Sequence, residues 1–196
     1  MNPPRLLLAS SSPRRRNLLV LLGFPFSVAN PGIDETPRPG EDPARLALRL
    51  ARTKARTVAR THPAGWVILA ADTTVALGDS ILDKPGDAAT NAQRLRLLSG
   101  RTHRVHTAVA VLAGGRLSTR TVTTRVRFRR LDAEEIARYA ARGEGHDKAG
   151  GYALQGAALA FVSGLEGSPS AVVGLPLVET RALLLRAGLR PGATGA

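Results

Sequence analysis

The chain begins with a short apolar strand that leads directly into an unusual helix start. Leu6 to Ala9 is followed by three serines, Pro13 and three arginines, and then by a helix-forming run up to Leu22. Proline suits the first turn of a helix, and Ser12 is placed to cap it. Arginines in that turn are unfavourable for an isolated helix, because they meet the positive end of its dipole. Since free N–H groups at a helix N-terminus bind anions, this strand-to-helix junction predicts a phosphate-binding corner.

Helix and strand patterns alternate along the rest of the chain and predict an α/β fold. The expected helices cover residues 13–22, 42–61, 87–98, 132–142 and 176–187. The expected strands cover residues 6–9, 26–29, 66–77, 81–82, 106–113 and 116–128. A second hairpin is expected from residues 159–162 and 171–173. The strand at 66–77 contains a continuous apolar run, which is typical of a strand buried on both faces.

Composition excludes several classes of protein. The 196 residues contain no cysteine, which removes disulfides, thiolate catalysis and sulfur-ligated metals. No apolar run is long enough for a membrane span or a secretory signal, so a cytoplasmic location is the default expectation. The net charge of +13 raises the question of nucleic acid, but arginines are spread along the whole chain and aromatic residues make up only 4%. A solvated basic surface is therefore favoured over a specific nucleic-acid interface.

Candidate catalytic groups lie where strands end. Asp72 directly follows the buried apolar run, and it is well placed for a functional role because open α/β sheets bind ligands beyond the carboxyl ends of their strands. The alternative is a buried aspartate that accepts from backbone amides. Asp34 and Glu35 share a loop before the long helix, and Lys84 is one of only three lysines, the others being Lys54 and Lys148.

Other known chemistries do not fit. The chain has no GxxxxGK[ST] phosphate loop, no HExxH motif and no GxSxG nucleophile elbow, and its four histidines lack zinc spacing. The remaining hydroxyls, cations and carboxylates suit a magnesium-bound polyphosphate. In such a site carboxylates hold the metal and activate water, while arginine and lysine stabilise charge on the phosphates.

Eight segments resemble the Maf family of nucleotide pyrophosphatases, in order and at natural spacing: LLLASSSPRRRNLL, IDE, LARTKA, ILAADTTV, ILDKP, LSGRTHRVHTAV, DKAGGYALQG and VVGLPLVET. The resemblance implies an α/β fold of the Maf and inosine-triphosphatase type, with a mixed sheet, flanking helices and two lobes around a central cleft. It implies hydrolysis of nucleoside triphosphates to monophosphate and pyrophosphate by a homodimer with a divalent metal, Mg²⁺ or Mn²⁺, with Co²⁺ as a further option. The segments Asp147–Gly150 and Gln155–Gly156 resemble the branch that acts on dTTP, UTP and modified pyrimidine triphosphates.

The resemblance also implies roles for individual residues. Asp72 would accept the proton from the attacking water and also touch the metal, which Glu35 would help to bind. Implied for substrate binding are Ser10, Arg14, Arg15, Lys54, Thr73, Lys84, Lys148 and Gln155. Arg14, Thr73 and Gln155 are the positions implied to set substrate preference. Whether Asp34, Asp83 or Glu144 assists at the metal stays open.

Residues 1–190 are expected to form one Maf-like domain, with a flexible tail at 191–196. Gly145 stands where the family commonly has proline, which predicts a more flexible loop. Two other functions stay open at this point. One is a pyrophosphatase for another base, such as 7-methyl-GTP, and the other is a basic nucleic-acid-binding or division-regulating protein.

Overall fold

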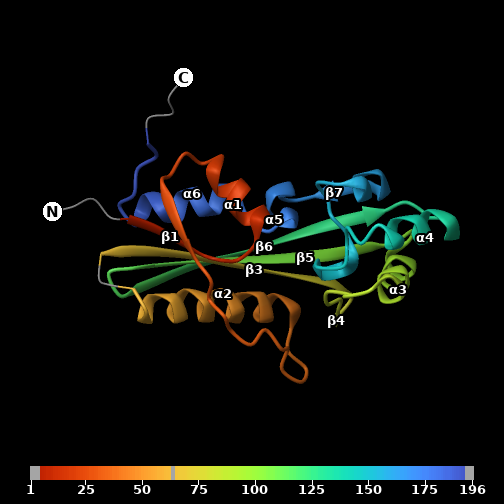
Figure 1. Ribbon diagram of the computed structural model, residues 1–196, viewed down its shortest axis with the longest axis horizontal. Helices are drawn as coiled ribbons and strands as arrows, with labels where there is room; N and C mark the ends of the chain where they lie inside the picture. The colour runs from red at the N-terminus through yellow and green to blue at the C-terminus, as the bar shows by residue number, and fades with distance from the viewer. Residues whose placement is uncertain (1–4, 63–64, 193–196) are drawn as a thin grey trace.

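A mixed sheet of seven strands runs through the centre of the computed structural model, which describes residues 5–62 and 65–192 (Figure 1). The strands are β1 (Arg5–Ala9), β2 (Phe26–Ala29), β3 (Trp66–Leu77), β4 (Ser80–Ile81), β5 (Thr102–Ala113), β6 (Arg116–Phe128) and β7 (Val162–Glu166). Their order is β2-β1-β3-β5-β6-β7, with β4 paired to the end of β3. β1 is parallel to β2 and β3, whereas the remaining pairs are antiparallel.

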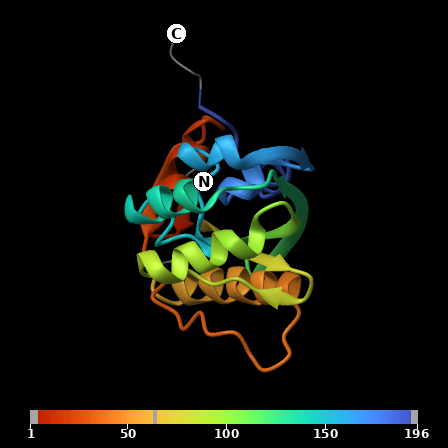
Figure 2. The same ribbon diagram turned by 90° about the vertical axis from the view of Figure 1, so that its right-hand side faces the viewer.

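Helices cover both faces of this sheet. They are α1 (Pro13–Val20), α2 (Pro43–Arg60), α3 (Ala88–Leu98), α4 (Ala133–Ala141), α5 (Pro169–Val173) and α6 (Leu177–Arg186), with 3-10 turns at Ala149–Gly151 and Ala157–Phe161. α2 lies along one face, and α1, α5 and α6 lie along the other, as the end-on view also shows (Figures 1 and 2). In the described ranges no helix is long and apolar enough to cross a membrane. The predicted α/β class, with a mixed sheet and flanking helices, is confirmed.

Apolar side chains point alternately to the two faces of the sheet along β1 and β3, which explains why helices cover both faces. Leu6 and Leu8 pack with α1 and α6, while Leu7 and Ala9 pack with α2. Successive strand residues point to opposite faces, so a strand that is apolar throughout needs helices on both sides. The far ends of β3, β5 and β6 form a third cluster with α3 and α4, which contains Phe128 and other buried aromatic rings. β3, β5 and β6 therefore connect the two ends of the fold without a break.

Most expected elements are present, but the second hairpin prediction is wrong. Residues 157–161 form a 3-10 turn, residues 162–166 form β7 against β6, and residues 169–173 form α5. The hydroxyl of Ser168 accepts from the N–H of Ala171 and Pro169 occupies the first turn, so a capped helix start overrides the strand preference of the two valines that follow. β5 also begins at Thr102, earlier than the expected 106. Of the expected tail, residues 193–196 lie outside the described residues, and Gly192 donates its N–H to the Gly23 carbonyl at 2.8 Å.

Candidate active site

A cleft of about 600 Å³ opens where β1 stops and β3 continues. The parallel register pairs Leu8 with Leu69, so the next stretch of β3, around Asp72, extends beyond the end of β1. The chain leaving β1 turns there into α1, whose first residues line the cleft. The other walls are the loop before α2, the segment after β4, and the segment from Asp147 to Gln155. All the residues expected to bind substrate or metal line this single cleft.

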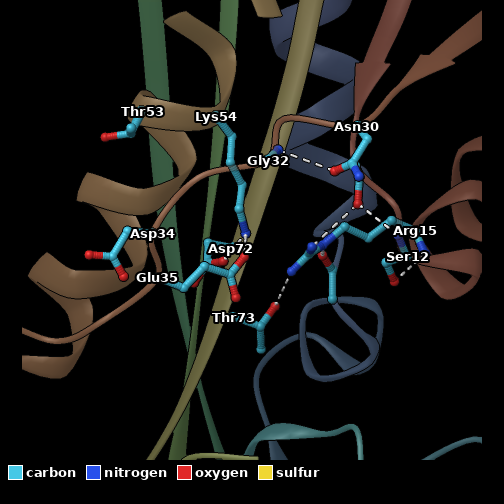
Figure 3. Close-up of polar contacts among 12 residues, drawn as sticks. Ser12, Arg15, Asn30, Gly32, Asp34, Glu35, Thr53, Lys54, Asp72 and Thr73 are labelled. Atoms are coloured by element: carbon cyan, nitrogen blue, oxygen red, sulfur yellow. Dashed lines mark hydrogen bonds and ion pairs between the residues drawn. The ribbon is translucent and has the colours of Figure 1, made fainter. Parts of the chain in front are cut away.

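Asp72 and Lys54 form the buried centre of the cleft, and Glu35 contacts Lys54 from an exposed loop (Figure 3). Lys54 Nζ lies 2.6 Å from Asp72 Oδ1 and 2.5 Å from Glu35 Oε1. The Lys54 and Asp72 side chains are only 5% and 8% exposed, whereas Glu35 is 42% exposed in its loop. Burial alone would raise the pKa of Glu35, but hydrogen bonds and attraction from Lys54 and Lys84 outweigh it and lower that pKa below its ordinary value. Glu35 is therefore ionised at neutral pH.

Asp72 and Glu35 fit a divalent cation. Both carboxylates approach the same ammonium group, so the fold already gathers negative charge at one point for a cation. The described residues contain no group of three or more His, Cys, Asp or Glu side chains that could hold a metal by themselves. Two carboxylates suit Mg²⁺, which commonly takes one or two from the protein and its other ligands from phosphates and water.

The three further carboxylates differ in their surroundings. Asp34 Oδ1 accepts from the N–H and the hydroxyl of Thr36, at 2.9 and 2.6 Å. Glu144 accepts from the hydroxyl of Tyr139 at 3.2 Å and from the N–H of Ala157, at the start of the second 3-10 turn, at 3.3 Å. Asp83 lines the cleft beside Lys84. Asp34 and Glu144 thus support turns, and Asp83 is the one of the three that lines the cleft.

The start of α1, where the sequence predicts a phosphate-binding corner, lines the cleft. Ser12 is the N-cap of α1, as expected, and its hydroxyl accepts from the Arg15 N–H. The buried Ser10 hydroxyl accepts from the Ser12 N–H and from Arg15 Nη1, at 3.1 and 3.4 Å. Arg15 also donates to the Gly174 carbonyl at 2.9 Å and to the Thr73 hydroxyl at 3.4 Å. Burial lowers the pKa of Arg15 and the nearby Asp72 and Glu35 partly offset this, but a guanidinium stays protonated in proteins.

Arg15 differs from the other cations of the cleft in its hydrogen-bond partners. In the described part of the chain its partners are neutral oxygens, and it forms no ion pair. Arg14, Lys54, Lys84 and Lys148, by contrast, each contact a carboxylate. Arg15 can therefore receive an anion without first giving up a carboxylate partner.

Thr107 lies behind Thr73 and determines the direction of its hydrogen bond. The two hydroxyls are 3.0 Å apart, and the Thr107 hydroxyl is also 2.7 Å from the Ala171 carbonyl. A carbonyl only accepts, so the single Thr107 proton goes to Ala171 and Thr73 donates to Thr107. The lone pairs of Thr73 are then free to accept from Arg15 and from groups in the cleft. Sequence reasoning missed Thr107, although a fully buried threonine within an apolar strand is a signal that could have found it.

Asp147 joins the start of α1 to the opposite wall. Its carboxylate contacts Arg14 Nη1 at 3.2 Å and Lys148 Nζ at 2.6 Å. These contacts hold the pKa of Asp147 below its ordinary value, although partial burial acts in the other direction. The side chain was not among the predicted site residues, because nothing in the sequence pairs it with Arg14. Gln155 lines the same cleft, and within the described residues its side chain bonds to none of the others.

The family model for Maf-like proteins matches residues 5–187. The chain belongs to the Maf family. A relative named dTTP/UTP pyrophosphatase from Myxococcus xanthus is 56% identical over 184 residues, which cover 94% of this chain and 93% of the relative. Another of that name, from Rhodospirillum rubrum, is 53% identical over 192 residues, 97% of this chain and 91% of the relative. A solved nucleoside-triphosphatase / dITP/XTP pyrophosphatase from Mycobacterium abscessus is 21% identical, with a TM-score of 0.45 over 65% of this chain and 75% of that one. The resemblance to the Maf family inferred from the eight segments is confirmed.

Proposed function

We propose that this Maf protein hydrolyses nucleoside triphosphates, above all dTTP and UTP and their modified pyrimidine analogues, to the monophosphate and pyrophosphate. The observation that carries the proposal is the buried Asp72, which shares an ammonium with Glu35 at the floor of a cleft with cationic walls. The choice of dTTP and UTP is supported by the relatives named dTTP/UTP pyrophosphatase, which match nearly the whole chain.

The cations around the cleft suit the triphosphate. Arg15, held by neutral oxygens, is placed to bind phosphate at the N-terminus of α1 together with Ser10. Lys84 and Lys148 can exchange their carboxylate partners for phosphate oxygens, because both partners, Glu35 and Asp147, lie at the exposed side of the cleft. Charge that develops on the leaving pyrophosphate is stabilised by these groups.

Asp72 is the general base. Lys54 binds its Oδ1 and fixes the carboxylate, and Oδ2 has no hydrogen-bond partner among the described residues. A water held by Oδ2 gives up its proton to that oxygen as the water oxygen bonds to the α-phosphorus. The bond from the α-phosphorus to the bridging oxygen breaks, and pyrophosphate leaves. A divalent cation, Mg²⁺ or Mn²⁺ with Co²⁺ as a further option, would be held by Glu35 and Asp72 and would neutralise charge on the phosphate oxygens.

Base preference is assigned to Arg14, Thr73 and Gln155, which line the cleft on three different segments. The Thr73 hydroxyl presents an acceptor, and the Gln155 amide offers both a donor and an acceptor. Together they can match the alternating groups on the edge of a uracil or thymine ring.

The test is pyrophosphate release with Mg²⁺ from dTTP, UTP, CTP, ATP, GTP and 7-methyl-GTP. Asp72→Asn is expected to lower kcat by about 10²–10⁴-fold, the usual contribution of a general base. Asp79→Asn is the matched control, because Asp79 lies exposed in the turn after the same strand. Near-normal turnover by Asp72→Asn would contradict the mechanism, and turnover of 7-methyl-GTP alone would replace the substrate assignment. Absence of turnover with every nucleotide and metal would overturn the enzyme function.

A homodimer, a divalent metal and a cytoplasmic location complete the proposal. Light scattering on the purified chain tests the dimer. Removal of metal by EDTA is expected to abolish turnover, and addition of Mg²⁺ or Mn²⁺ is expected to restore it.

A further inference from the structure

The loop of residues 30–42, which carries Glu35, has no helix or strand of its own. Its internal hydrogen bonds are short-range, such as Thr36 to Asp34 and the Arg38 N–H to Glu41 at 3.0 Å. Across residues 5–62 and 65–192, ion pairs and hydrogen bonds from three side chains tie this loop to other elements. Two of them, Lys54 and Lys84, act through Glu35 itself. The third is Arg49.

Arg49 contacts the loop at two residues that follow Glu35 in the sequence, Thr36 and Glu41. Its Nε and Nη2 donate to the two carboxylate oxygens of Glu41, each at 2.6 Å. Nη2 also donates to the carbonyl of Thr36, the residue after Glu35, at 3.1 Å. The side chains of Arg49 and Glu41 are only 22% and 10% exposed, so this paired contact is screened less than an ordinary surface ion pair.

The charge state of Glu41 agrees with a persistent contact. Hydrogen bonding from Arg49 is the largest influence and lowers the pKa of Glu41 to about 2. The carboxylate therefore stays ionised over the whole range in which the protein would work. Arg49 lies on α2, five residues before Lys54, so one helix carries both the ammonium that meets Glu35 and the guanidinium that holds its loop.

We propose that Arg49 is a positioning residue for Glu35. This inference rests on the proposed function. Glu35 would give up its contacts with Lys54 and Lys84 on binding a metal, so these two contacts cannot keep the loop in place through the reaction. Arg49 is not among the described residues that line the cleft, so its contacts with Glu41 and Thr36 would remain when Glu35 exchanges its lysine partners for a metal. Without Arg49, no other side chain among the described residues would hold the loop once Glu35 has given up its lysine contacts, and the Glu35 carboxylate would move away from the metal position.

The test compares Arg49→Met, Arg49→Lys and the matched control Arg52→Met. Arg52 is on the same helix and is exposed. The concentration of Mg²⁺ at half-maximal turnover is expected to rise about 10- to 100-fold for Arg49→Met, the usual effect of losing a group that orients a metal ligand. Arg49→Lys is expected to need more Mg²⁺ for half-maximal turnover as well, because one ammonium cannot reproduce a planar guanidinium that contacts three oxygens. Arg52→Met is expected to stay within twofold of the parent.

A second readout does not depend on turnover. Hydrogen exchange of the peptide covering residues 30–42, without metal or nucleotide, is expected to speed up at least about tenfold in Arg49→Met and not elsewhere. Unchanged exchange there, or a uniform acceleration along the chain with an unchanged Mg²⁺ requirement, would overturn the proposal. If the parent protein hydrolyses no nucleotide, the proposed function fails, while the exchange comparison still decides whether Arg49 holds this loop.

Discussion

The buried ion pair at the floor of the cleft allows a quantitative test of the site. Lys54→Met removes the ammonium but keeps most of the apolar length of the side chain. Asp72, at 8% exposed, is then left as a buried carboxylate without the counter-charge that contacts it. Loss of one partner from a buried pair destabilises a protein by about 3–5 kcal/mol. Glu35 adds little to this cost, because its side chain is 42% exposed and water can solvate it.

The expected change is large enough to measure directly. For a chain of this size, 1 kcal/mol corresponds to about 2–4 °C in Tm, so Lys54→Met is expected to lower Tm by roughly 6–20 °C. Urea unfolding at pH 7.5 in EDTA gives the same quantity as a free energy. The double variant Lys54→Met/Asp72→Asn separates charge from packing, because it leaves no buried charge at this point. We expect the double variant to recover most of the lost stability, although it is inactive.

Two results would refute this reasoning. One is a loss below about 1 kcal/mol in Lys54→Met, which is the value expected of an exposed pair. The other is a double variant no more stable than Lys54→Met, which would assign the loss to packing rather than to the unpaired charge.

Three further predictions concern the surroundings of the cleft. Thr107→Val leaves Thr73 without its acceptor, so kcat/KM is expected to fall about tenfold in steady-state assays while Thr107→Ser keeps activity. Burial lowers the pKa of His103 from 6.5 to about 4, so the unfolded state takes up a proton first as pH decreases. The unfolding free energy should therefore fall by about 3 kcal/mol between pH 6.5 and 4. In urea titrations of His103→Gln, the unfolding free energy should depend less steeply on pH. Gly145→Ala places a Cβ 2.0 Å from the Gly151 carbonyl, and a raised KM with a lower Tm is expected; unchanged values would contradict the close packing.

Residues close together in the sequence were sufficient to predict most of the helices and strands. The cap at Ser12 and Pro13 predicted the start of α1, and the apolar run before Asp72 predicted the buried strand β3, although Asp72 lies within that strand and not at its end. These features depend on residues a few positions apart, where backbone propensity and side-chain periodicity decide the structure. The same kind of reasoning failed at residues 169–173, where two valines suggested a strand although a cap at Ser168 begins a helix.

Contacts between distant residues could not be predicted in this way. Arg14 meets Asp147 across 133 positions, and Thr107 meets Thr73 across 34. Neither pair has a sequence spacing that indicates contact, because the sheet register and the path of the loops bring them together. Gly145 is a related case. The absence of the family's proline there predicted a more flexible loop. The sequence could not show that a Cβ at this position would collide with the backbone of Gly151.

The uninterrupted strands under the cleft have a consequence for how the family can diversify. β3 and β5 are paired at nine consecutive positions that extend on both sides of Asp72, so the hydrolytic floor is a stiff unit. Of the three residues proposed to set base preference, only Thr73 lies on β3, whereas Arg14 and Gln155 belong to separate segments of the cleft wall. Grafting those two segments from a relative with another preference, together with residue 73, should therefore transfer base selectivity and leave the cleavage chemistry intact. With such an arrangement, substitutions in the cleft walls can change base selectivity while the strands beneath them stay the same.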